Sequence, residues 1–87
     1  MAITTNRVTV GTVATIVDGT YNSNFRLVIH NNDNTDAVYI GGPDVTITNG
    51  LVLQKEETIQ LQMNPLESIY AVSGKAGHTI SYLKQVQ

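Results

Sequence analysis

The sequence predicts an all-β protein: a small antiparallel β-sandwich or jelly-roll-like barrel of about seven to nine short strands, with little or no helix. Three features of the chain lead to this prediction. Apolar and polar residues alternate in many short runs, and successive side chains leave a strand on opposite faces. These runs are rich in β-branched and aromatic residues and are bounded by Gly, Asn, Asp or Pro. No window of useful length carries apolar residues at helical spacing.

The clearest alternation lies in FRLVIHN, residues 25–31, and in ETIQLQM, residues 57–63. Each run predicts a half-buried strand with one wet face. The side chains expected on the buried side are Phe25, Leu27, Ile29, Ile59, Leu61 and Met63. Further strands are expected over residues 7–10, 13–17, 37–40, 45–47, 51–53, 68–73 and 78–86.

Gly41, Gly42 and Pro43 follow the expected strand 37–40. A phosphate-binding glycine loop would lead into a helix whose N-terminus faces the anion, whereas a strand is expected to follow here. Paired glycines in a strand context usually mark a bulge or corner, and a proline ends a ladder because it lacks an N–H donor. The glycine pair therefore predicts a corner in a sheet.

Two further turns are marked by their residue types. Asn49 and Gly50 separate two alternating runs, which predicts a two-residue type I′ hairpin. Pro65 follows an asparagine and predicts a type I turn. Residues 31–36 form an expected polar loop, and residues 18–24 form a longer one that carries Tyr21.

The chain has 87 residues, which corresponds to one domain. Residues 1–6 precede the first alternating run and are expected to form an N-terminal arm, with residues 7–87 as a single β domain. So small a domain buries little surface, and with no cysteine in the chain disulfides cannot supplement it. Association with other subunits is the remaining source of buried area, so a homo-oligomer is expected.

Charge and hydropathy exclude several partners. The net charge is −2, and the basic residues are scattered rather than gathered into a stripe, so no nucleic-acid partner is expected. The N-terminus has no signal-peptide pattern, and no apolar run approaches the roughly 18 residues that span a bilayer. No membrane association is expected.

The titratable residues do not form a recognisable catalytic or metal-binding motif. His30 and His78 have no partner at ligand spacing and are expected on the surface. Asp33 and Asp36 could at most hold an ion loosely. Ser73 lacks the glycine two residues earlier that a nucleophile elbow requires. We therefore expect no catalytic residues, no metal site, no cofactor and no enzymatic activity.

One longer succession of residues carries a resemblance. A strand reading Val-Tyr-Ile-Gly-Gly leads into a Val-Thr segment, then an alternating apolar strand, then an Ile-Tyr-Ala strand. The residues concerned are Val38, Tyr39, Ile40, Gly41, Gly42, Val45, Thr46, Gly50, Leu53, Ile69, Tyr70 and Ala71. Over about residues 7–86 this pattern resembles small β domains of tailed-bacteriophage virion proteins, in which a Gly-Glu turn often precedes the alternating strand. Here QKEET lacks that glycine.

The resemblance implies a structural virion protein that binds the outside of a capsid and cements or decorates the lattice of the major capsid protein. A trimer at local three-fold positions is the favoured assembly, and the capsid exterior is the expected location. Binding to the assembled lattice but not to free subunits would stabilise the lattice by mass action. Tyr21 and the arm are the candidate partner-binding residues, although a frayed terminus would explain the arm's sequence equally well. The arm residues concerned are Ile3, Thr4, Thr5, Asn6 and Arg7.

A second class of function stays open. The loops 18–24 and 31–36 combine Asn and Asp with one aromatic residue, a composition that also occurs where proteins bind sugars. The alternative is a tail- or fibre-associated module that binds a glycan or protein on the host surface.

Overall fold

The computed structural model describes residues 3–19, 23–33 and 35–86. Its strands are β1 (Ile3–Val10), β2 (Thr15–Gly19), β3 (Phe25–Asn31), β4 (Val38–Gly41), β5 (Leu51–Leu53), β6 (Thr58–Met63), β7 (Ser68–Ser73) and β8 (His78–Val86). These ranges contain no helix, and hence none long and apolar enough to cross a membrane.

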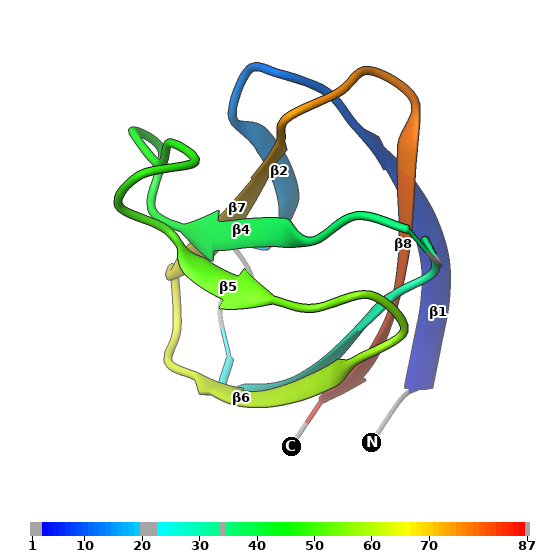
Figure 1. Ribbon diagram of the computed structural model, residues 1–87. Helices are drawn as coiled ribbons and strands as arrows, with labels where there is room; N and C mark the ends of the chain where they lie inside the picture. The colour runs from blue at the N-terminus through cyan, green and yellow to red at the C-terminus, as the bar shows by residue number, and fades with distance from the viewer. Residues whose placement is uncertain (1–2, 20–22, 34, 87) are drawn as a thin grey trace.

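The strands form two antiparallel sheets, in the orders β1-β8-β3-β6 and β2-β7-β4-β5 (Figure 1). Successive strands pass from one sheet to the other, and only β4 and β5 are both consecutive and paired. This order is that of a jelly roll, in which the first and last strands lie side by side. The predicted all-β sandwich is confirmed.

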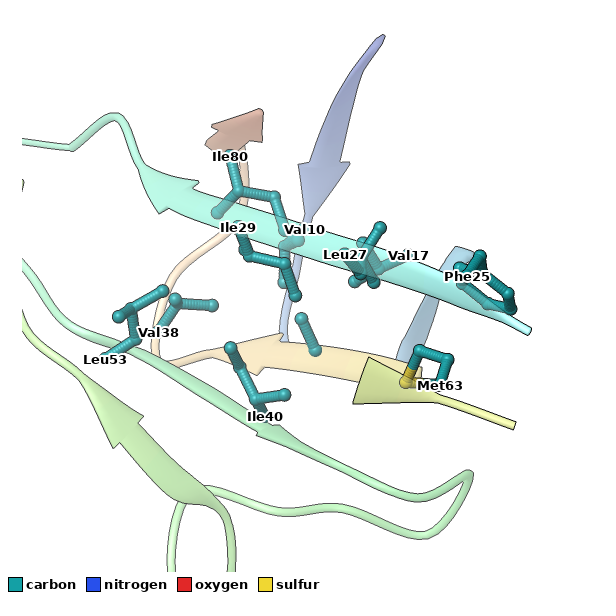
Figure 2. Packing of buried hydrophobic residues seen from close by; sticks show 11 residues of the cluster. Val10, Val17, Phe25, Leu27, Ile29, Val38, Ile40, Leu53, Met63 and Ile80 are labelled. Atoms are coloured by element: carbon teal, nitrogen blue, oxygen red, sulfur yellow. The ribbon is translucent and has the colours of Figure 1, made fainter. Parts of the chain in front are cut away.

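The core lies between the two sheets and follows from the alternation in the sequence (Figure 2). Phe25, Leu27 and Ile29 of β3 are fully buried, whereas the residues between them are only half-buried. Val38 and Ile40 face them from β4 of the other sheet. Burying an aliphatic or aromatic side chain of this size contributes about 1.5–3 kcal/mol, so this strip supplies a large share of the stability.

The N-terminal segment corrects the division of the chain into an arm and a domain. The described part of the expected arm belongs to β1, which pairs with β8 along its whole length, from Ile3 opposite Gln85 to Val10 opposite His78. The alternation in ITTNRVTV is weak because its N-terminal half is exposed, so sequence periodicity missed the strand. β1 is an edge strand, so only one of its two edges is paired.

The segment between β4 and β5 differs from the expected strand 45–47 and hairpin. Residues 42–50 contain no strand, and neither Asn49 nor Gly50 has the positive φ that a type I′ turn requires. Instead the Gly50 N–H donates to the Thr46 carbonyl at 3.0 Å, and the Thr46 N–H donates to Asn49 Oδ1 at 2.8 Å. β5 therefore pairs with β4 across the nine residues 42–50, and not with a strand at 45–47 across a two-residue turn.

The turn at Pro65 is also of a different type. The Glu67 N–H donates to the Asn64 carbonyl at 3.2 Å, and Leu66 has a φ of 67°. A positive φ at the third residue alone defines a type II turn rather than the expected type I turn. Residues 54–57 form a second turn of the same kind, with Glu56 at a φ of 56°.

Candidate protein-binding surface

The outward side of the β2-β7-β4-β5 sheet is apolar, as its inward side is. Val38 and Ile40 of β4 point to the core, so Tyr39 between them points outward, opposite Val52 and Val72 on the flanking strands. By the same alternation Ile16 and Tyr70, which are paired with each other, lie on the outward side.

Residues 42–50 fold over part of this side. Val45 is buried but lies outside the core cluster. A Cβ atom added at Gly41 or at Gly50 would lie 2.9 Å from Val45 Cγ2, and one at Gly50 would lie 2.7 Å from Tyr39 Cβ. Both positions require glycine because Val45 packs against their backbone. Gly41 ends β4, and residues 42–45 form the turn that follows it, with Pro43 and Asp44 at its centre; the Val45 N–H donates to the Gly42 carbonyl at 3.1 Å.

Large apolar side chains stay exposed around this segment. Ile16 is 44% exposed, Ile47 51% and Val52 43%. Ile47 contributes to two hollows of about 190 and 230 Å³; the first is also lined by Tyr39 and Lys75. We call the surface formed by Ile16, Tyr39, Ile47, Val52 and Tyr70 the outer apolar face. Contiguous exposed apolar surface of this kind usually marks a site of contact with another protein.

A buried polar network fixes one end of this face. His78 is fully buried, with Nδ1 3.0 Å from Ser73 Oγ and Nε2 2.7 Å from Asn31 Oδ1. Asn31 Nδ2 donates to the carbonyls of Asp36, Leu53 and Gln54, so Oδ1 is the acceptor and His78 carries its proton on Nε2. Burial lowers the pKa of His78, which keeps the ring neutral.

Ser73 and His78 do not form a catalytic pair. The Ser73 hydroxyl is buried; it donates to the unprotonated Nδ1 of His78 and accepts from the Lys75 N–H at 3.2 Å. Both functions of the hydroxyl are therefore used inside the fold. A nucleophile needs an accessible oxygen facing a substrate, so this arrangement is structural.

A second, charged cluster extends the network to the surface. Lys75 Nζ lies 2.6 Å from Asp33 Oδ2 and 3.0 Å from Asp36 Oδ2. The bond from Lys75, followed by those from Thr35, lowers the pKa of Asp33; the bond from Lys75 also lowers the pKa of Asp36. The ammonium lies where the sequence allowed a loosely held ion, and the described residues contain no group of three potential metal ligands. The cluster joins residues 31–36 to the β7–β8 turn, beside the hollow that Asp36, Ser73 and Lys75 help to line.

The candidate partner-binding residues predicted from the sequence do not belong to this face as far as the structure describes them. Thr5 and Arg7 lie on β1 in the other sheet, as do Ile3, Thr4 and Asn6. Tyr21 lies outside the described residues. His30 is half-buried and contacts Thr58 Oγ1 at 2.8 Å.

The expectation of a surface position for His78 was wrong. Strand parity carried the signal: His78 precedes buried Ile80 by two residues, and Asn31 follows buried Ile29 by two. Both side chains therefore point into the sandwich. Polar side chains at inward positions need hydrogen-bond partners there, and Asn31 and His78 are partners of each other.

No protein-family model matches the chain, and no curated protein matches it. Among solved structures, a chain reported under "Bacillus endospore appendages form a novel family of disulfide-linked pili" is similar in fold. The TM-score is 0.57 at 14% sequence identity, over 97% of this chain and 88% of that one. At this identity the likeness supports the fold alone, a small all-β domain. This chain has no cysteine with which to form the disulfides named there.

Proposed function

We propose that the chain is a non-enzymatic structural subunit that binds the outside of a tailed-phage capsid through its outer apolar face and cements the lattice of the major capsid protein. The observation that carries the proposal is the outer apolar face itself, with Ile16, Ile47 and Val52 each more than two-fifths exposed. The resemblance of residues 7–86 to virion β domains supplies the identity of the partner.

The geometry suits an interface rather than a substrate site. The hollows beside Ile47 are small, and each would accept a side chain from a partner surface. The face is mostly apolar with few charges, which is typical of the centre of a protein interface. Residues 42–50 are held by Val45 and the two glycines, so binding costs little loop ordering.

Cosedimentation with capsids that lack this chain tests the proposal. Ile47→Asp and Val52→Asp each place a carboxylate in the contact and are expected to weaken binding about tenfold or more. The control Thr9→Asp places the same carboxylate at an exposed position of β1, in the opposite sheet, and should bind as the natural sequence does. Equal binding by all the variants would overturn the use of this face.

The abundance of the chain in particles separates this function from the second candidate. Lattice decoration predicts hundreds of copies per virion, in a simple ratio to the major capsid protein, when peptides are quantified by mass spectrometry. The second candidate is a tail- or fibre-associated module that binds the host surface, and the fold similarity to an appendage subunit favours it. That function predicts only a few copies and binding to a glycan or protein of the host.

A further inference from the structure

The fold does not require a leucine at position 66. It has a left-handed φ of 67° and is 69% exposed, on the turn between β6 and β7. A left-handed backbone conformation favours glycine, and an exposed apolar side chain contributes no free energy of burial. The matching turn 54–57 carries the polar Glu56 at the same place. The stability of the turn therefore does not explain a leucine at this position.

A hollow of matching character lies elsewhere on the molecule, on the outward side of the β1-β8-β3-β6 sheet. Thr5, Val28 and Leu83 share one row across three strands of this sheet and line a shallow, mainly apolar hollow of about 210 Å³. Val28 and Leu83 remain half-buried with nothing described above them. The hollow can receive one aliphatic side chain.

Charges around the two features are complementary. Arg7 lies two residues from Thr5 along β1, and Arg26 lies two residues from Val28 along β3, on the same outward side. The outward positions of the four strands carry no carboxylate. Leu66 is followed by Glu67, whose Oε1 accepts from the Asn64 N–H at 2.6 Å and so holds the carboxylate beside the leucine. The exposed Leu66, which we call the knob, therefore lies beside a negative charge, and the rim of the hollow carries positive charges.

We propose that two copies of this chain associate head to tail, with Leu66 of one copy seated over Val28 and Leu83 of the next and Glu67 facing Arg7 or Arg26. The two contact patches are different parts of the surface, so the contact is heterologous. Such contacts close into rings, including the trimer expected from the sequence, when the rotation between copies allows it, and otherwise form open chains. The proposal does not depend on the capsid partner, because it concerns the chain alone.

Sedimentation velocity of the purified full chain over a range of concentrations tests this contact. Leu66→Gly removes the knob and suits the left-handed backbone, so this variant should fold and yet associate about tenfold or more weakly. Thr5→Glu places bulk and negative charge in the hollow and should have the same effect. The matched controls Glu56→Gly and Thr9→Glu change the other turn and another exposed site of β1, and should associate as the natural sequence does.

Mixing the two disabled variants gives the decisive result. Leu66→Gly keeps its hollow and Thr5→Glu keeps its leucine, so a mixture should form one-to-one heterodimers although neither variant associates by itself. A natural chain that stays monomeric at every concentration, association unchanged by Leu66→Gly, or a mixture without heterodimers would each overturn the proposal. Capsid binding through the outer apolar face would be unaffected by any of these results.

Discussion

Single residues with left-handed backbone set the two turns on either side of β6. Glu56 and Leu66 both stand third in a type II turn, where glycine is preferred. In each turn the glutamate at the fourth position accepts a hydrogen bond from the N–H of the first residue: Glu57 Oε1 accepts from Gln54 at 2.9 Å, and Glu67 Oε1 accepts from Asn64 at 2.6 Å. This side-chain bond, together with the backbone bond of the turn, compensates the unfavourable φ. QKEET can therefore form this turn without the glycine that the similar virion domains often carry there.

The first prediction follows for Glu56. Glu56→Gly removes a left-handed cost of about 1–2 kcal/mol and adds a smaller entropic cost, so the free energy of unfolding should rise by about 0.5–1 kcal/mol. Urea denaturation measures the change. Lys55→Gly, one residue earlier where φ is not positive, should lower stability instead. A loss of stability in Glu56→Gly would contradict the assigned turn.

At the scale of elements, the Ser73–His78–Asn31 network joins the two sheets: Asn31 and His78 belong to the paired strands β3 and β8, and Ser73 belongs to β7 of the other sheet. Asn31 ends β3, and its side chain bonds to the carbonyls of Asp36 before β4 and of Leu53 and Gln54 at the end of β5. His78 begins β8 and accepts a bond from the end of β7. One end of the sandwich is therefore held by buried side chains rather than by apolar packing, which makes it sensitive to protonation.

The second prediction concerns pH. The pKa of His78 is lowered from 6.5 by burial, an effect that the carboxylate of Asp33, 3.8 Å from Nδ1, only partly opposes; Lys75 lowers it further and Asp36 opposes it. Below pH 6.5 the unfolded chain takes up a proton that the folded chain does not. Stability is therefore full above this pH and should fall below it, by up to about 1.4 kcal/mol per pH unit.

Urea denaturation between about pH 7.5 and about pH 5 checks this. Asp33 and Asp36 have lowered pKa values, so their contributions are lost only as the pH falls below their ordinary value of 3.8, outside this range. His30→Gln, which removes the other histidine, should keep the decrease. Constant stability across the range would contradict a neutral, buried His78.

At the scale of the whole molecule, an ion pair crosses between the two sheets at the end remote from His78. Lys84 of β8 lies 3.2 Å from Asp18 of β2, with side chains only 16% and 11% exposed. The ammonium also lies 5.8 Å from the centre of the Phe25 ring, a favourable cation–π distance. The sandwich is thus joined by a polar contact at each end and by apolar packing between them.

The third prediction tests this pair. Lys84→Met removes the cation facing a nearly buried carboxylate and should lower the free energy of unfolding by about 3 kcal/mol. Changing both partners, in Asp18→Asn with Lys84→Met, should recover much of the loss. Lys55→Met at an exposed turn should change stability by less than about 0.5 kcal/mol. If Lys84→Met matched that control, the pair would have no part in holding the sheets together.

The sequence by itself determined the class of the fold, because strand parity is a local property. The alternation of Phe25, Leu27 and Ile29 places these residues in the core without knowledge of their partners. The end of the strand at Gly41 to Pro43 could also be predicted locally, since a proline lacks the N–H donor that a ladder needs, but the glycine at position 41 is required by the packing of Val45. Strand parity also predicts inward positions for Asn31 and His78, although the contact between the two side chains could not be inferred from their spacing.

Only the tertiary structure decided what depends on distant residues. β1 is a strand because β8, more than sixty residues away, supplies its ladder, so its weak alternation looked like an arm. Gly50 is required by the space that Tyr39 and Val45 occupy, not by the positive φ that its sequence context suggested. The outer apolar face likewise exists only because strand order brings Ile16, Tyr39 and Val52 onto one side of a sheet. Pairing between distant strands is set by packing of the whole chain, which no short window of sequence contains.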